Sequence, residues 1–416
     1  MRYSRLTALI LSAALALSLA LPAQAAEGDG WLIDKVKDAP SFTDTAGIWC
    51  QAEVETVCQA GLMEGKSADR FAAADPLTNA QVIVIAARTY TALAGKDPVA
   101  QAEEGEPWYQ PSYDCLAALE ENAGDKGRSR LLSLYELQRT ADDPCTRGAF
   151  ANLLLLALDG ADVTLPERNT LTAATPDLPP EHEVYTLYRA GILAGTDAYG
   201  TFDSEGRLNR GQAAAMLARL VDPEKRQSFT LEPLDACRDI LGLDPYATAL
   251  TIDGTSIRAD VMTFALCSAL KTQYNRLICD GPSANHLEAV VPEATAAMKE
   301  DLALERLAAE RGITVTEEDL EETYGPMVSG YRGLSEAAQK WENTHNLMKS
   351  RLSALYNEQY GSEAVGPSPG APSWGEEALD NDLWKLMEQM TVQTASTLEQ
   401  LDLSAAQTRL VQSPLF

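Results

Sequence analysis

Apolar residues recur at helical spacing along most of the chain. The clearest runs are Val82, Ile85, Ala86 and Tyr90, and Ala213, Met216, Leu217 and Leu220. Apolar residues three and four positions apart form one face of an amphipathic helix. A short extended segment is indicated only around Ile252 and Ile257, on either side of an Asp-Gly turn sequence. The sequence therefore predicts a mostly α fold.

A repeated order of features runs through the first half of the chain. Residues 40–95 and 182–224 each contain a predicted helix, a Gly-apolar-apolar-x-Gly break, a loop that ends on Phe, and a second helix. The two breaks are GLMEG and GILAG, and Gln81 matches Gln212 near the start of the second helices. A degenerate copy lies between them, with DDPCTRGAFANLLLLALDG as its second helix.

Three positions set the period of this repeat. Asn79, Arg147 and Arg210 lie at nearly equal intervals, and Thr, Thr and Asn stand directly before them. These are residue types that cap the start of a helix. The predicted repeats span residues 40–95, 107–160 and 171–224. One helical hairpin cannot bury its apolar face alone, so we expect the three to pack into one pseudo-threefold bundle.

Proline- and glycine-rich stretches divide the second half of the chain. Residues 228–250, with two prolines, are expected to connect the repeats to a helical domain at 251–360. Within that domain a Thr-x-x-Asp capping-box pattern predicts the start of a new helix. Residues 361–376 have the Pro/Gly/Ser composition of a linker, and residues 377–416 are expected to form a C-terminal helical segment.

The N-terminus has the composition of a secretory signal peptide. Arg2 and Arg5 precede an apolar run, and an Ala-Gln-Ala sequence follows it. A positive segment, an apolar segment and an A-x-A site in this order predict cleavage, here with removal of residues 1–25. An uncleaved membrane anchor is the alternative. We expect an exported mature chain without a transmembrane segment.

The charge balance excludes two classes of partner. Acidic residues outnumber basic ones, 61 to 33, in the 416-residue chain, and the formal net charge is −28. A surface this negative repels phosphate backbones and anionic lipids, so we expect neither nucleic acid nor a membrane surface as a partner. A solubilising surface is the simplest explanation of the excess.

Cysteine and histidine patterns give no sign of a metal or redox site. The seven cysteines include no Cys-x-x-Cys pair. An export compartment favours disulfides, and Cys115 with Cys145 is the first pair to test, because both fall in one predicted repeat. Buried apolar thiols are the alternative. His182, His286 and His345 are scattered, and no nucleophile elbow, P-loop or Rossmann glycine motif occurs. We predict no metal, no cofactor and no enzymatic activity.

The first half of the chain resembles the S-layer homology family. The resemblance rests on FTDTAGIWCQAEVETVCQAGLMEG with the later LTNAQ, and on LYRAGILAGTDAYGTFDSEGRLNRGQAAAMLARL. It implies three helical units in a pseudo-threefold bundle on the surface of a Gram-positive-type bacterium. It also implies non-covalent binding to a pyruvylated secondary cell-wall polysaccharide.

The resemblance further implies a set of ligand-binding residues. The family's Thr-Arg-Ala-Glu motif places an arginine at the start of the second helix, where Arg147 and Arg210 match it. Arginine binds a carboxylate through two parallel hydrogen bonds, and the helix dipole favours an anion there. The first repeat has Asn79 instead, which cannot form that charged pair. Asp44 and Trp49 match family positions before the first helix. Local capping by the arginines, and packing of Trp49 between units, are the alternatives.

The second half resembles the helical chaperone region of SurA- and PrsA-type foldases. TIDGTSIRADVMTFAL and LALERLAAERGITVTEEDLEE carry the resemblance, which covers residues 250–360. It implies a helical lobe that holds unfolded or exported polypeptide. Many relatives also carry a parvulin prolyl isomerase domain, and here only the Pro/Gly/Ser linker occupies that place.

Together these patterns predict a secreted, non-enzymatic protein of the cell wall, with a wall-binding module and a C-terminal chaperone-like domain. Two alternatives stay open. One is a structural S-layer or envelope assembly protein whose C-terminal helices mediate assembly. The other is an active peptidyl-prolyl isomerase foldase, which the missing parvulin domain disfavours.

Overall fold

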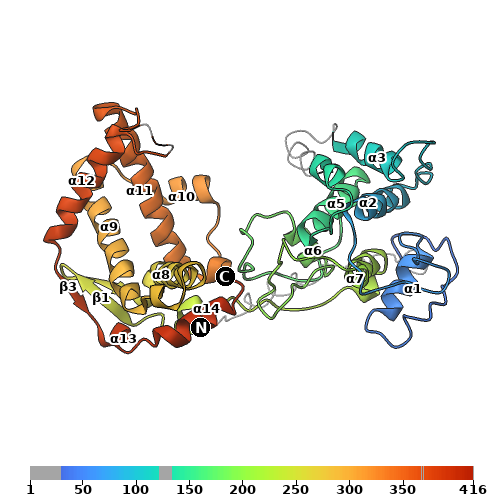
Figure 1. The fold of residues 1–416 in the computed structure, drawn as a ribbon, viewed down its shortest axis with the longest axis horizontal. Coiled ribbons are helices and arrows are strands. Elements are labelled where there is room, and N and C mark those ends of the chain that lie inside the picture. Colours follow the sequence, from blue (N-terminus) through green and yellow to red (C-terminus); the bar gives the residue numbers. More distant parts are fainter. Residues whose placement is uncertain (1–29, 121–133, 367, 369, 416) are drawn as a thin grey trace, which may run out of the picture.

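The computed structural model describes residues 30–120, 134–366, 368 and 370–415 (Figure 1). The predicted signal peptide and part of the second repeat lie outside the described residues. The described chain is mostly α, as the apolar spacing predicts. Figure 1 shows two bodies. We call them the N-terminal body, with core residues from Ile33 to Val221, and the C-terminal body, with core residues from Ala236 to Leu410.

The N-terminal body is built from short helices. They are α1 (Gln51–Gln59), α2 (Asn79–Leu93), α3 (Gln110–Glu120), a helical stretch at 134–139, α5 (Arg147–Gly160), α6 (Tyr185–Arg189), α7 (Arg210–Val221) and the 3₁₀ turn η1 (Pro223–Lys225). α2 packs against α5 and α3, and α1 packs against α7.

Helices α2, α5 and α7 begin alike. The side chains of Thr78, Thr146 and Asn209 each accept a backbone N–H from the first turn of their helix. Gln81 and Gln212 complete capping boxes, because their side chains accept the N–H of the capping residue in return. Each capping residue has extended backbone angles, the usual geometry at this position. The three predicted N-caps are confirmed.

A closed ring of backbone hydrogen bonds joins the segments just before these three helices. Leu77 N–H donates to the Leu208 carbonyl at 3.0 Å, and Leu208 N–H donates to the Cys145 carbonyl at 3.0 Å. Cys145 N–H closes the ring by donating to the Leu77 carbonyl at 2.8 Å. Each segment donates to one neighbour and accepts from the other, which is the connectivity of a threefold arrangement. The ring also satisfies buried backbone groups that would otherwise be unpaired.

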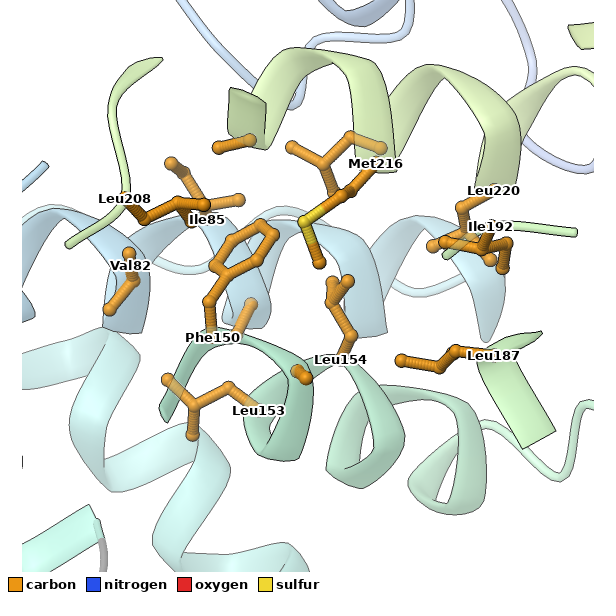
Figure 2. Packing of buried hydrophobic residues seen from close by; sticks show 14 of the residues in the cluster. Val82, Ile85, Phe150, Leu153, Leu154, Leu187, Ile192, Leu208, Met216 and Leu220 are labelled. Atoms are coloured by element: carbon orange, nitrogen blue, oxygen red, sulfur yellow. The ribbon is translucent and has the colours of Figure 1, made fainter. Parts of the chain in front are cut away.

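The core of the N-terminal body lies between the same three helices. Figure 2 shows Phe150 of α5 pointing toward α2 and α7, near Val82, Ile85 and Met216. Phe150 is 0% exposed. An isolated hairpin would leave these apolar faces in water, and the bundle buries them together.

The glycine breaks end the first helices in two different ways. Gly61 and Gly191 have φ angles of +72° and +76°, the left-handed region that the breaks predict. Gly65 does not have a positive φ. A Cβ there would lie 2.5 Å from the ring of Phe42 and 2.6 Å from the carbonyl oxygen of Ser67. The prediction is confirmed at Gly61 and Gly191 and wrong at Gly65, where glycine provides space instead.

The C-terminal body combines longer helices with a small sheet. Its elements are the π-helix η2 (Ala236–Ile240), β1 (Thr248–Ile252), β2 (Thr255–Arg258), α8 (Ala259–Asp280), η3 (Pro282–Ala284), η4 (Leu287–Ala289), α9 (Val290–Glu310), α10 (Glu317–Tyr324), η5 (Tyr331–Gly333), α11 (Glu336–Tyr360), α12 (Trp374–Gln389), β3 (Val392–Thr394), α13 (Ser396–Glu399) and α14 (Leu403–Val411). α8 packs against α9, and α11 packs against α12.

The strands form one antiparallel sheet in the order β2-β1-β3. Ile252 pairs with Thr255 across the Asp-Gly turn, so the extended segment expected on either side of this turn is a short hairpin. Ile252 also pairs with Val392 of β3, a strand that the sequence does not predict. Residues 228–250, expected as a connector, contain η2 and part of β1, and contribute buried side chains to the C-terminal core.

Asp253, in the hairpin turn, holds β3 in place. Its carboxylate accepts the backbone N–H and the hydroxyl of Thr391, each at 2.8 Å, and the Nη2 of Arg306 at 2.7 Å. These bonds stabilise the charged form, with the Thr391 backbone N–H as the largest contributor, and lower the pKa of Asp253 from 3.8 to about 2.

The lowered pKa of Asp253 predicts acid sensitivity of the sheet. A carboxyl group whose pKa is lower in the folded state stabilises the fold above its ordinary pKa, and that contribution is lost as the pH falls from about 4 to about 2. We expect Asp253→Asn to reduce the acid-induced fall of the urea midpoint of the C-terminal body. Asp280→Asn, which changes an exposed carboxylate on α8, is the matched control. An equal fall in wild type and Asp253→Asn would contradict this account.

The two bodies meet beside the third repeat. Arg332 N–H donates to the Pro176 carbonyl at 2.9 Å, and Ala174 N–H donates to the Ser329 carbonyl at 3.1 Å. Gly330 lies at this contact with φ of +99°, and a Cβ there would lie 2.6 Å from the Ala174 carbonyl oxygen. The segment between α10 and α11 therefore approaches the N-terminal body by backbone contact.

All seven cysteines are free thiols, so Cys115 and Cys145, the first pair to test, form no disulfide. Cys145 belongs to the backbone ring, is 0% exposed, and donates its Sγ–H to the Thr146 carbonyl at 3.2 Å. Burial raises the pKa of the Cys145 thiol to about 12. The alternative interpretation, a small buried apolar side chain, describes this residue better.

Candidate functional site

Arg210 reaches from the first turn of α7 into the first repeat. Its Nε donates to the Phe71 carbonyl at 2.8 Å, and its Nη2 donates to the Glu64 carbonyl. The guanidinium carbon lies 4.5 Å from the centre of the Phe71 ring. Arg210 is 6% exposed, and burial lowers its pKa. A buried arginine still stays charged at neutral pH. Here its guanidinium binds two backbone carbonyl groups of the neighbouring repeat.

Arg147 makes the corresponding contact with the third repeat. Its Nε donates to the Phe202 carbonyl at 2.8 Å, and its guanidinium carbon lies 5.8 Å from the centre of the Phe202 ring. Asn79 occupies the third position and donates through Nδ2 to the carbonyl and hydroxyl of Thr140, at 2.9 and 3.0 Å. Its buried Oδ1 has no hydrogen-bond partner among the described residues. All three side chains therefore connect one repeat to the next.

Asp44 fixes the loop that ends on Phe71. Its carboxylate accepts the N–H of Phe71 at 2.9 Å and the N–H of Ala72 at 2.7 Å. The bond from Phe71 is the main reason that the pKa of Asp44 is lowered. In the third repeat Asp177 accepts the N–H groups of Phe202 and Asp203 in the same way, at 3.0 and 2.7 Å. Asp177 was not among the predicted residues, although Thr-Pro-Asp and Phe-Thr-Asp place an aspartate at matching positions.

Trp49 lies just before α1, and its side chain is 67% exposed. It does not join the buried core of the N-terminal body. Its place on the surface leaves its face accessible to solvent.

A hollow of about 180 Å³ lies where Arg210 meets the first repeat. We call it the Arg210 groove. It is lined by Leu62, Met63, Glu64, Gln81, Val84, Ile85, Arg88, Trp108 and Arg210. A second hollow of about 590 Å³ shares Leu62, Glu64, Val84, Arg88 and Trp108 with the groove. Its volume lies in the range of small-molecule sites, roughly 300–1,000 Å³.

The groove offers a distinctive set of contacts. Arg88 and Arg210 supply guanidinium groups from two different repeats, and Trp108, 58% exposed, supplies an aromatic face. Glu64 pairs with Lys37 at 2.6 Å and with Arg88 at 3.5 Å. The hydrogen bond from Lys37 is the main cause that lowers the pKa of Glu64. Guanidinium groups bind carboxylates, and an exposed indole ring can stack on a sugar face.

Arg88, Glu64 and Trp108 were missed from sequence because the groove forms between segments far apart in the chain. Arg88 belongs to no recognisable sequence motif. Trp108 follows an acidic stretch before α3. A helical projection would have found Arg88, since it lies seven residues after Gln81 and so on the same face of α2. Trp108 could be found only from the packing of α3 against α2.

Within the described part of the chain, His, Cys, Asp and Glu side chains do not gather in threes that could hold a metal ion. No helix in the described ranges combines the length and hydropathy needed to cross a bilayer.

Comparison with known families identifies one domain. A family model for the S-layer homology domain matches residues 41–83, a stretch that contains Asp44, α1 and the first turn of α2. The match supports an S-layer homology domain protein. Such domains bind cell-wall polymers, which implies non-covalent attachment at the cell surface. No curated protein matches the chain.

Proposed function

We propose that this protein is anchored non-covalently to a pyruvylated secondary cell-wall polysaccharide through three S-layer homology repeats. The observation that carries the proposal is the Arg210 groove, formed where an arginine of the third repeat meets the domain matched at residues 41–83. The closed ring through Leu77, Cys145 and Leu208 supports three equivalent repeats.

The chemistry of the groove suits a pyruvyl ketal on a sugar. Such a ketal holds one carboxylate rigidly beside a saccharide ring. Arg210 uses two of its five N–H groups for the carbonyls of Phe71 and Glu64, so it has further donors to offer a carboxylate. The start of α7 adds the positive end of a helix dipole. Trp108 would lie against the sugar, and Asp44 would act indirectly by fixing the Phe71 loop.

Binding to purified cell walls tests this proposal. We expect the full chain to co-sediment with untreated walls and to bind much less to walls from which mild acid has removed the pyruvyl groups. The reason is that the carboxylate supplies the charge-assisted bonds. Both wall preparations are compared at the same ionic strength, so that screening of non-specific charge effects is equal in the two. Equal binding to both wall preparations would refute a carboxylate site.

For the C-terminal body we propose a polypeptide-binding, chaperone-like role without enzymatic activity. Exposed aromatic side chains support this, because Tyr360, Trp374 and Trp384 are 47%, 51% and 57% exposed on α11 and α12. Tyrosine and tryptophan are enriched where proteins contact partner chains. The proposed location is the cell wall of a Gram-positive-type bacterium, after export and removal of residues 1–25.

Two assays separate this role from its alternatives. Suppression of the aggregation of an unfolded client would favour the chaperone-like role. Ordered arrays without client binding would favour a structural S-layer or envelope assembly protein. A rate of prolyl isomerisation above background in a tetrapeptide assay would refute the non-enzymatic proposal and favour a foldase.

A further inference from the structure

Glu64 places a carboxylate inside the groove itself. Its side chain is 54% exposed and lines both hollows, so it lies on the path of a ligand. It pairs with Lys37 at 2.6 Å from one side and with Arg88 at 3.5 Å from the other. Its own backbone carbonyl accepts the Nη2 of Arg210. One residue therefore contacts three of the cationic groups around the site.

The third repeat lacks this carboxylate at the matching position. GLMEG and GILAG align Glu64 with Ala194. Arg219 lies seven residues after Gln212, as Arg88 lies seven after Gln81. Without a carboxylate at residue 194, Arg219 donates to the Ile192 carbonyl at 3.0 Å. The internal ion pair is a feature of the first repeat and not of the repeat pattern.

An internal carboxylate has two effects on an anionic ligand. It repels the ligand directly, because like charges a few ångströms apart disfavour each other. It also occupies Arg88, whose guanidinium would otherwise be available to the incoming carboxylate. A ligand must then displace Glu64 from Arg88 or rely on Arg210 alone. A neutral saccharide meets neither effect.

We infer that Glu64 is a competing carboxylate that sets the affinity and charge selectivity of the Arg210 groove. The inference rests on the proposed function of this groove as the site of a carboxylated saccharide. In the free protein the single negative charge of Glu64 is shared between Lys37 and Arg88 and offsets part of their positive charge. It thereby weakens the binding of acidic ligands. The uncharged contacts between Trp108 and the sugar then contribute a larger share of the binding free energy.

The test compares a monosaccharide that carries the pyruvyl ketal with its uncharged methyl ester. We expect Glu64→Gln in the full chain to bind the acid about fivefold more tightly than wild type, which is the effect expected from one exposed charge interaction. The variant and wild type should bind the ester with equal affinity. The gain for the acid should shrink at high salt. Titration calorimetry at low and high salt measures both. Because Glu64 is exposed, thermal melting is expected to show an unchanged fold.

Glu136→Gln is the matched control. Glu136 pairs with Arg139 at 2.7 Å in an exposed ion pair outside the groove. The substitution makes the same chemical change, and the affinities for the acid and for the ester should both stay as in wild type. Equal affinity of wild type and Glu64→Gln for the acid would overturn this inference and leave the wall-binding proposal intact. An equal gain for acid and ester would also overturn it, because the effect would not depend on charge. Failure of wild type and variant to bind either ligand would overturn both.

Discussion

Replacement of Phe150 by alanine is expected to lower the free energy of unfolding of the N-terminal body by about 3–5 kcal/mol. Phe150 is fully buried where α2, α5 and α7 converge (Figure 2). Truncation there removes the apolar contacts by which α5 packs against both α2 and α7. The rigid ring before the helices, through Leu77, Cys145 and Leu208, leaves little freedom for the helices to close the cavity.

Urea unfolding followed by circular dichroism measures this effect. Phe150→Leu is the matched control, because it keeps a branched apolar side chain that fills part of the space and should cost less than alanine. If alanine cost under 1 kcal/mol, the three helices would not share one core. The repeats would then be separate hairpins, and a groove between repeats would lose its structural basis.

The double variant Arg147→Ala, Arg210→Ala is expected to bind untreated walls at least about tenfold more weakly. Arg210 provides one of the two guanidinium groups of the groove, and Arg147 holds the matching position against the third repeat. Both also bond to carbonyls of a neighbouring repeat, at 2.8 Å from Nε in each case. Their removal should therefore cost stability as well, by roughly 1–3 kcal/mol for each unpaired buried carbonyl.

Binding and stability are separated by measuring wall affinity well below the melting temperature of the variant. Arg210→Lys is informative, because it keeps the charge but loses the bidentate geometry, so its affinity should lie between wild type and alanine. Arg139→Ala is the control for loss of a surface arginine. Its side chain is 64% exposed and pairs with Glu136 at 2.7 Å, outside the groove. Unchanged wall binding by a folded double variant would remove both arginines from the site.

Structural features that depend on neighbouring residues, such as helix caps and tight turns, could be predicted from the sequence. The capping residues Thr78, Thr146 and Asn209 act within one turn of their own helix, so residue type and position were sufficient. The hairpin around Asp253 is equally local, since two adjacent residues determine its turn. The shared core of α2, α5 and α7 was expected on general grounds, because one hairpin cannot bury its apolar face alone.

Structural features that depend on contacts between distant parts of the chain could not be predicted from the sequence. β3 has three residues, too few to display an alternating pattern, and it is positioned by Asp253 far back in the chain. Arg147 and Arg210 were expected to face a ligand, and the sequence could not show that each also binds a neighbouring backbone carbonyl. Trp108 enters the groove only because α3 packs against α2.

Hydrogen exchange of the full chain, with and without the purified pyruvylated polysaccharide, locates the binding site. We expect slower exchange at residues 62–64, which line the groove, and around Trp108, with no change in the C-terminal body. Polysaccharide without its pyruvyl groups should give no such protection. Protection confined to other surfaces, or protection that is equal with and without the pyruvyl groups, would contradict a carboxylate site at Arg210.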